Sequence, residues 1–125
     1  MPEQKLVLII DDDHGISDAA KAFLLSKGFE VVQAFDGEEG VETAKGINPD
    51  LILLDIIMPK KDGFTVVREL KANPSLSRIP VIVYSAKEGM KELFAIEGIE
   101  HYLVKPINNN DLLACVNKLL GMNLN

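Results

Sequence analysis

The residues of this sequence with the clearest chemical potential are carboxylates that stand beside long apolar runs. Asp55 interrupts the apolar stretch of LILLDIIMPKKDG, residues 51–63, and three aspartates in a row, Asp11 to Asp13, follow the largely apolar residues 5–10. A carboxylate beside a buried strand is unfavourable unless it is paired, binds a metal or faces a cleft. The position of these aspartates therefore indicates a functional site.

Two other polar residues, Ser85 and Lys105, also follow apolar runs. Carboxylates that converge on one pocket repel each other, so either one of them holds a proton or a cation lies between them. Oxygen ligands without a cluster of histidines or cysteines favour Mg²⁺ or Mn²⁺ over zinc. A divalent cation, an ammonium and a hydroxyl together match the three equatorial oxygens of a phosphoryl group in transfer. Because an aspartate can accept such a group, the set indicates phosphorylation of Asp55.

Five apolar stretches alternate with five amphipathic ones along the chain. The first, third and fourth are almost continuous Val, Ile and Leu, as in parallel strands covered on both faces. This alternation predicts the α/β class, with right-handed crossovers and a (βα)₅ doubly wound parallel sheet. The strands are expected at residues 5–10, 30–35, 50–55, 79–85 and 101–105, and the helices at 16–28, 36–46, 63–72, 88–98 and 109–121.

The expected sheet explains why the polar residues come where they do. In doubly wound sheets, ligands bind outside the carboxyl ends of the strands, where the strand order reverses. Four of the five expected strands end in polar residues, whereas the second ends in Ala34 and Phe35. The second strand therefore suits the edge of a sheet with the order 2-1-3-4-5, and the polar residues collect at one rim.

Composition limits the classes of protein that this chain can belong to. Its 125 residues are 47% hydrophobic and 26% charged, which predicts one globular domain over residues 1–125. A net charge of -6 argues against direct binding of nucleic acid. The single cysteine, Cys115, is expected as a small core residue and fits a reducing cytoplasm. No leader pattern or 18-residue apolar run occurs, so we expect a cytoplasmic protein without membrane contact.

Four segments carry a resemblance to a known family: LIIDDDH, LILLDIIMPKKDGF, VIVYSA and YLVKP, in this order. Together they resemble the receiver domain of two-component response regulators, along essentially the whole chain. The resemblance implies a flavodoxin-like fold and a phosphoryl group accepted on Asp55. The donor would be a sensor histidine kinase or a histidine phosphotransfer domain. It also implies that the chain is no enzyme beyond its own phosphorylation and dephosphorylation, and we expect a stand-alone or amino-terminal receiver.

The resemblance also assigns a metal site. Asp12 matches the direct ligand of Mg²⁺ in the family, with Mn²⁺ as a substitute, and Asp11 matches the ligand that acts through water. Asp55 and the backbone carbonyl of Ile57 would complete the protein's share of the ligands.

Further positions match the family's switch. Ser85 corresponds to the switch hydroxyl and Tyr102 to the aromatic side chain that turns inward on phosphorylation. Lys105 matches the family's lysine, and Pro106 the proline that follows it by a cis peptide. From the residues alone, the alternative for Ser85 is a hydroxyl that caps the short fourth helix, which is compatible with the switch role, and the alternative for Tyr102 is a half-buried strand aromatic.

Neighbouring polar residues have structural interpretations. Asp13 fits a solvated start of the first helix, where negative charge favours the helix dipole. His14 is expected as an exposed flank of the site rather than a ligand. Asp62 and Gly63 most simply form the turn and cap that open the third helix.

A phosphohydrolase of the haloacid-dehalogenase type is the alternative function. Such enzymes also use a strand-end aspartate, Mg²⁺, a hydroxyl and a lysine, and Asp11-x-Asp13 has their spacing. Against this, Gly15 stands where they usually carry Thr or Val, and they need more chain for a cap. A flavin-binding flavodoxin is excluded because the Ser/Thr-Gly-rich phosphate loop after the first strand is missing.

The resemblance further bears on output and on signal lifetime. Ser85 and Lys105 are about two residues closer together than is usual in the family, so the fourth helix, or the loop before it, should be short. In many receivers the fourth helix, last strand and last helix form the partner or dimer surface. We expect this surface to bind an unknown downstream protein and the chain to be a monomer. Ile57 and Lys87 would flank the path of water to the phosphorylated Asp55, which predicts slow self-dephosphorylation.

Overall fold

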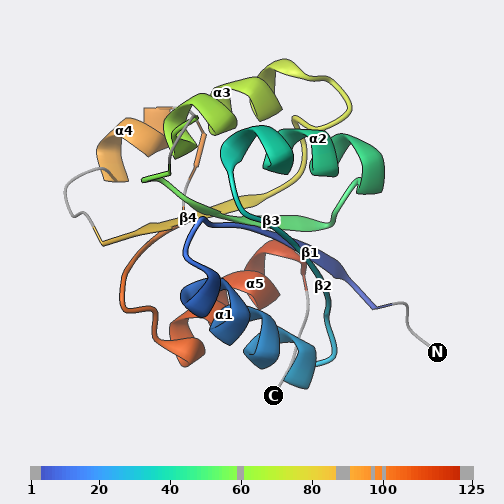
Figure 1. Ribbon diagram of the computed structural model, residues 1–125, viewed down its shortest axis with the longest axis vertical. Coiled ribbons are helices and arrows are strands. Elements are labelled where there is room, and N and C mark those ends of the chain that lie inside the picture. The colour runs from blue at the N-terminus through green and yellow to red at the C-terminus, as the bar shows by residue number, and fades with distance from the viewer. Residues whose placement is uncertain (1–3, 59–60, 87–90, 97, 100, 122–125) are drawn as a thin grey trace.

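A parallel sheet of five strands forms the centre of the protein, and helices cover both of its faces (Figure 1). The computed structural model describes residues 4–58, 61–86, 91–96, 98–99 and 101–121. The order β2-β1-β3-β4-β5, with all pairs parallel, confirms the predicted doubly wound, flavodoxin-like (βα)₅ fold. The strands are β1 (Leu6–Ile10), β2 (Glu30–Ala34), β3 (Leu51–Asp55), β4 (Val81–Ser85) and β5 (His101–Val104).

The helices form two layers, one on each face of the sheet. In Figure 1, α1 and α5 lie below the sheet, and α2, α3 and α4 lie above it. Their bounds are α1 (His14–Ser26), α2 (Gly37–Ile47), α3 (Gly63–Ala72), α4 (Lys91–Ile96) and α5 (Asn109–Leu119).

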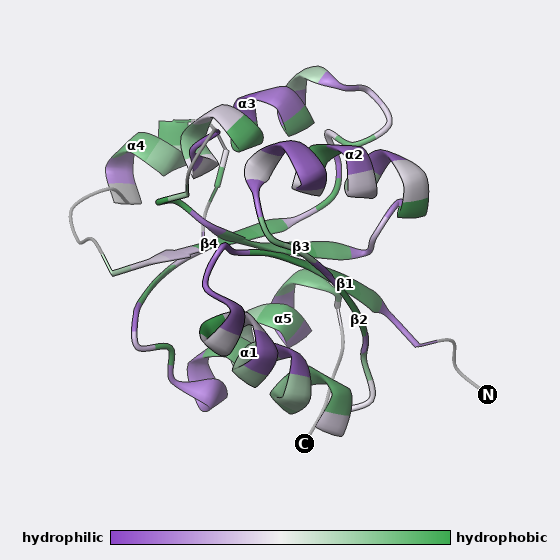
Figure 2. Cartoon of the chain, in the orientation of Figure 1, coloured by the Kyte–Doolittle hydropathy of each residue, from purple (hydrophilic) through white to green (hydrophobic). Residues whose placement is uncertain are grey.

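The core consists of two apolar clusters separated by the sheet, and the strands are its most apolar part (Figure 2). Alternate residues of a strand point to opposite faces. In β1, Leu8 and Ile10 pack towards α2, α3 and α4, whereas Val7 and Ile9 pack towards α1 and α5. All four are fully buried. Each such side chain stabilises the fold by about 1.5–3 kcal/mol, which explains why the central strands are apolar at consecutive positions.

Side-chain caps begin the helices directly after the loops that leave the sheet. Oδ1 of Asp13 accepts a hydrogen bond of 3.0 Å from the Ile16 N–H, and Oδ1 of Asp62 accepts one of 2.8 Å from the Thr65 N–H. These contacts satisfy amide groups that the first helical turn leaves without partners. The predicted roles of Asp13 and Asp62 as helix starts are confirmed.

Among the described residues, several predicted boundaries were wrong by one or two residues. Helix α1 begins at His14, two residues before the predicted Ile16, because the polar first turn after the Asp13 cap adds no apolar signal. Strand β4 begins at Val81, since Pro80 has no N–H to donate to a neighbouring strand. Helix α4 is described over Lys91–Ile96 and the residues directly before and after it lie outside the described part of the chain, so the expected shortening of this helix or of the loop before it stays a prediction.

Cys115 differs from its expected place in the core. It is half-buried and packs at the margin of the apolar cluster on the α1 and α5 face, where burial raises the pKa of its thiol. Its helix, α5, presents Leu112 and Val116 to the sheet instead. In the part of the chain that the structure describes, no helix is long and apolar enough to span a bilayer.

Candidate functional site

Three aspartates converge at the carboxyl ends of the adjacent strands β1 and β3. One carboxylate oxygen from each of Asp11, Asp12 and Asp55 lies within 4.8 Å of the others. Asp11 and Asp55 are buried, whereas Asp12 is exposed and borders the solvent. Three oxygen ligands with this spacing suit a hard divalent cation such as Mg²⁺ or Mn²⁺. The predicted convergence of the aspartates at one rim is therefore present in the structure.

Lys105 comes into the same cluster from the residue after β5. Its Nζ lies 3.3 Å from Oδ2 of Asp55 and 3.5 Å from Oδ2 of Asp11. The Lys105 side chain is 14% exposed, so solvent screens these ion pairs only weakly. The backbone N–H of Lys105 donates to the Ser85 carbonyl at 2.8 Å, which ties the lysine to the end of β4. The peptide bond between Lys105 and Pro106 is cis, as the family resemblance predicted.

The environment of Asp55 changes its acidity. Its pKa is raised from 3.8 to about 6, first by burial and then by the neighbouring charge of Asp11, while Lys105 acts in the opposite direction. Burial disfavours the charged form, and a like charge nearby does the same. At neutral pH the carboxylate form still prevails, so Asp55 can act as a nucleophile.

Asp11 is held by more than the lysine. Its Oδ1 accepts a hydrogen bond of 2.9 Å from the Asp13 N–H, and its Oδ2 accepts one from the Tyr84 hydroxyl. Burial and this hydrogen bond raise the pKa of Tyr84 far above its usual range. The sequence pattern does not single out Tyr84, because this residue belongs to the apolar run of residues 79–85. The available signal was its place in the run: it stands directly before the polar end of the strand.

Ser85 and Tyr102 lie on neighbouring strands beside the cluster. Ser85 is fully buried at the end of β4, one residue beyond Tyr84, which is the register partner of Asp55. Tyr102 is partly buried on β5, and its ring centroid lies 6.0 Å from that of Phe94 in α4. Burial raises the pKa of the Tyr102 hydroxyl. This placement fits the alternative of a half-buried strand aromatic, and the switch role of Tyr102 stays a prediction.

The rim carries two further side chains. His14 is exposed, as expected, and its ring stacks on Phe35 with a centroid distance of 3.9 Å, a contact that was not predicted. Ile57 is 58% exposed, although it follows a buried strand. Lys87, which is predicted to flank the path of water together with Ile57, lies outside the described residues.

Comparison with known proteins assigns the family. Residues 7–117 match the model of the response regulator receiver domain. The chain belongs to this family. Receiver domains of two-component phosphorelay systems are phosphorylated by histidine kinases, and they are generally signalling domains rather than enzymes.

Relatives and solved structures agree with this assignment. The DNA-binding dual master transcriptional regulator RpaA of Synechocystis is 40% identical over 116 residues, which are 91% of this chain and 48% of RpaA. This receiver chain thus spans about half the length of RpaA.

Two solved receivers have the same fold. A Francisella response regulator receiver domain has a TM-score of 0.87 and 31% identity, and the match covers 94% of this chain and 98% of that one. The receiver of a Pseudomonas aeruginosa sensor histidine kinase has a TM-score of 0.86 and 28% identity, with coverages of 95% and 99%. The latter holds a magnesium ion in its active-site cleft.

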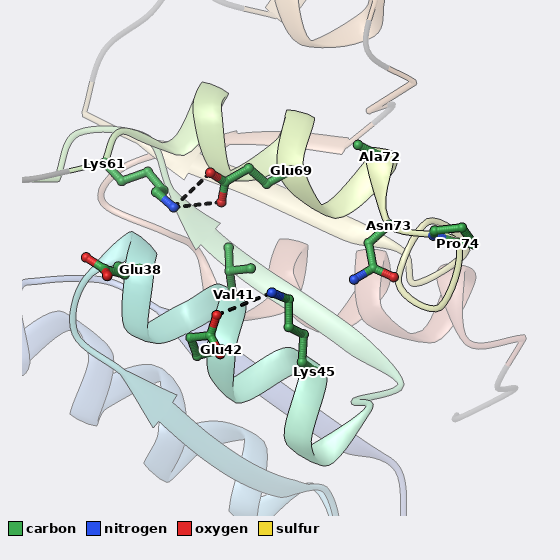
Figure 3. Close-up of a pocket in the computed structure, with 9 residues that line it drawn as sticks. All are labelled: Glu38, Val41, Glu42, Lys45, Lys61, Glu69, Ala72, Asn73 and Pro74. Atoms are coloured by element: carbon green, nitrogen blue, oxygen red, sulfur yellow. Dashed lines mark hydrogen bonds and ion pairs between the residues drawn. The ribbon is translucent and has the colours of Figure 1, made fainter.

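The receiver also has a polar groove between α2 and α3, shown in Figure 3, that contains none of the clustered aspartates. It has a volume of about 660 Å³. Lys61 Nζ lies 2.7 and 2.8 Å from the two carboxylate oxygens of Glu69, and Lys45 Nζ lies 3.3 Å from Oε1 of Glu42 (Figure 3). Both lysines are thus paired within the groove.

Proposed function

We propose that Asp55 accepts a phosphoryl group from the phosphohistidine of a sensor histidine kinase or a histidine phosphotransfer domain. The observation that carries the proposal is the position of Lys105, whose ammonium lies between the carboxylates of Asp55 and Asp11. A cation at this point balances the charge that a phosphoryl group brings to the rim. The family match supports this function for the single domain of residues 1–125.

The cation fits the aspartate cluster. Asp12, Asp55 and the carbonyl of Ile57 would hold Mg²⁺ or Mn²⁺ directly, and Asp11 would act through water. When bound, the ion neutralises charge on the phosphoryl oxygens. The magnesium in the cleft of the Pseudomonas receiver supports the same ion here.

The chain's own groups carry the transfer. An oxygen of the Asp55 carboxylate attacks phosphorus, a P–O bond forms, and the P–N bond to the donor imidazole breaks with its electron pair leaving on nitrogen. The Lys105 ammonium and the Ser85 hydroxyl donate to the phosphoryl oxygens. The transfer modifies the protein itself, so we propose no enzyme activity towards other substrates.

The donor has an apolar place to dock beside the site. A hollow of about 240 Å³ between α1 and α5 opens next to Lys105 and is lined mainly by apolar side chains, among them Ile16, Ala20, Ile107 and Leu112. A helix of the kinase or phosphotransfer domain in this hollow would bring its phosphohistidine to the rim. Such a donor is cytoplasmic, and we place this protein in the same compartment.

Output would use α4, β5 and α5. Because Tyr102 packs near Phe94 of α4, a change in its position at the rim alters what α4 packs against. Exposed apolar side chains lie on this face, at Leu93, Ile96 and Val104. We propose that a downstream protein binds here, with no direct contact to nucleic acid or membrane. The receiver is expected as a monomer, and a dimer by sedimentation at all concentrations would contradict that.

Intact mass after incubation with acetyl phosphate and Mg²⁺ tests the proposal. The wild type should gain one phosphoryl group, and Asp55→Asn should gain none. Asp62→Asn is the matched control, since asparagine also caps helices and Asp62 lies outside the site. Full labelling of the Asp55→Asn protein would show the assignment to be wrong. Multiple turnover of a small phosphate ester would favour the hydrolase alternative instead.

A further inference from the structure

A buried tyrosine, Tyr84, contacts two residues of the site, Asp11 and Lys105. Tyr84 is fully buried on β4 and is the register partner of Asp55 on β3. Alternation along the strands places both residues on the face that α1 and α5 cover. The order β1-β3-β4 means that the Tyr84 phenol reaches across the strand of Asp55 to the carboxylate of Asp11 beyond it.

The Tyr84 hydroxyl and the Lys105 ammonium share one acceptor. Both point to Oδ2 of Asp11, the lysine at 3.5 Å, while the Asp13 N–H occupies Oδ1 at 2.9 Å. A fully buried carboxylate needs such donors, and hydrogen bonds to a charged acceptor are strong. The phenol differs from the lysine because it donates without adding a positive charge to a site that must admit a cation.

The ring of Tyr84 also contacts the lysine. Lys105 Nζ lies 4.8 Å from the ring centroid, within the range of a cation–π interaction. The same ammonium lies 3.3 Å from Oδ2 of Asp55. The Tyr84 side chain therefore contacts both the Asp11 carboxylate, through its hydroxyl, and the Lys105 ammonium, through its ring.

We propose that Tyr84 is a positioning residue of the phosphorylation site, whose hydroxyl orients Asp11 for Mg²⁺ and whose ring holds Lys105 between Asp11 and Asp55. This inference rests on the proposed function. Without the hydroxyl, Asp11 rotates more freely and the Lys105 ammonium moves towards the vacated acceptor, where it competes with the metal ion. Without the ring, Lys105 loses its support as well.

Tyr84→Phe tests the role of the hydroxyl, because it keeps the ring. The Kd for Mg²⁺ is measured at pH 8 from the amide chemical shifts of each protein, which also report that the variant is folded. We expect the Kd to rise about tenfold, as is typical when the partner of a metal ligand is removed. A residue that merely fills the core would leave this Kd unchanged, so a change of less than twofold would overturn the proposal.

Tyr84→Leu tests the role of the ring, with Phe29→Leu as the matched control. Phe29 is 2% exposed in the same apolar cluster, so its substitution measures the loss of an aromatic ring from this core away from the site. At saturating Mg²⁺, labelling by acetyl phosphate should be near the wild-type rate for Tyr84→Phe and about tenfold slower for Tyr84→Leu. Equal rates for Tyr84→Leu and Phe29→Leu would refute the role of the ring.

The failure of this inference differs from the failure of the proposed function. If Asp55→Asn labels as fully as the wild type, the proposed function is wrong, and the Mg²⁺ titration of Tyr84→Phe still decides the role of the hydroxyl. If the wild type labels on Asp55 but Tyr84→Phe binds Mg²⁺ with the wild-type Kd, the function stands and the inference about Tyr84 is wrong.

Discussion

The Lys105 ammonium lies 3.3 Å from Oδ2 of Asp55, and both side chains are largely withdrawn from solvent. Asp11 is the second carboxylate within reach of this ammonium. Two buried carboxylates with one lysine leave the rim with an excess of negative charge. A divalent cation bound at the rim would offset this excess, so we expect the stability of the protein to depend on these three residues and on Mg²⁺.

Lys105→Met should destabilise the metal-free protein. Removal of one partner of a buried ion pair leaves the other charge without compensation, which costs about 3 kcal/mol. We expect a loss of this size in the free energy of unfolding, measured with urea in EDTA at pH 7.5. The loss should shrink at pH 5, where Asp55 binds a proton, and in excess Mg²⁺.

The control is a lysine from an exposed pair. Lys45 pairs with Glu42 at 3.3 Å, with side chains 48% and 69% exposed. Such pairs contribute about 0–1 kcal/mol, so Lys45→Met should change little under any of these conditions. Equal effects of the two substitutions would show that the Lys105 pair does not stabilise the fold.

Asp55→Asn should make the metal-free protein more stable at neutral pH. The pKa of Asp55 is about 6 in the folded protein against 3.8 for an unperturbed aspartate. Between these values the folded state binds more protons than the unfolded state, so the contribution of Asp55 to stability falls as the pH rises from about 4 to about 6. Two pKa units correspond to about 3 kcal/mol.

The difference between the two proteins reports the titration of Asp55 together with its effect on the neighbouring charges of Asp11 and Lys105, because groups away from the site are the same in both proteins. In EDTA, the free energy of unfolding of Asp55→Asn relative to the wild type should increase between pH 4 and pH 7, with an upper limit of about 3 kcal/mol. The same difference at both pH values would mean that burial does not raise the pKa of Asp55.

Gly63→Ala should disturb the site through the backbone. A Cβ at Gly63 would lie 2.6 Å from the Ile56 Cα and 2.7 Å from the Asp55 carbonyl oxygen, so the end of β3 would have to move. We expect a loss of about 1–3 kcal/mol in unfolding free energy, as in overpacked sites, and slower labelling by acetyl phosphate. The matched change, Gly46→Ala in α2, meets nothing within 4 Å and should stabilise by up to about 1 kcal/mol.

The sheet and most of the rim were predictable from the sequence for a physical reason. Parallel strands covered on both faces need apolar residues at consecutive positions, so the runs that end at Asp55 and Ser85 identified strands directly. Since parallel strands share one carboxyl edge, Lys105 and the aspartates had to meet there. This convergence could therefore be predicted without knowing the side-chain geometry.

Apolar patterns do not predict the hydrogen-bond partner of Tyr84 or the boundaries of the helices. The partner of Tyr84 depends on strand order and register together, because its hydroxyl passes the neighbouring strand to reach Asp11. The stacking of His14 on Phe35 joins a helix start to the end of an edge strand, and no periodicity reports such a contact. Helix α1 begins in polar residues, where a cap decides the start rather than apolar spacing.

The exposed side chain of Ile57 should slow the loss of the phosphoryl group. Ile57 is 58% exposed and lies two residues after Asp55, where a polar side chain would meet incoming water. The isoleucine side chain has no hydrogen-bonding atom, so it cannot orient a water molecule for in-line attack on phosphorus. Orientation of the nucleophile contributes strongly to such rates.

Ile57→Asn introduces a donor and an acceptor at this position, and we expect phosphoryl loss about tenfold faster than in the wild type. The measurement follows the phosphorylated mass in excess Mg²⁺ after acetyl phosphate is removed. Leu25→Asn is the matched control, since Leu25 is 48% exposed near the end of α1 that lies away from Asp13. If Ile57→Asn and Leu25→Asn lose the phosphoryl group at the wild-type rate, Ile57 does not set the lifetime of the signal.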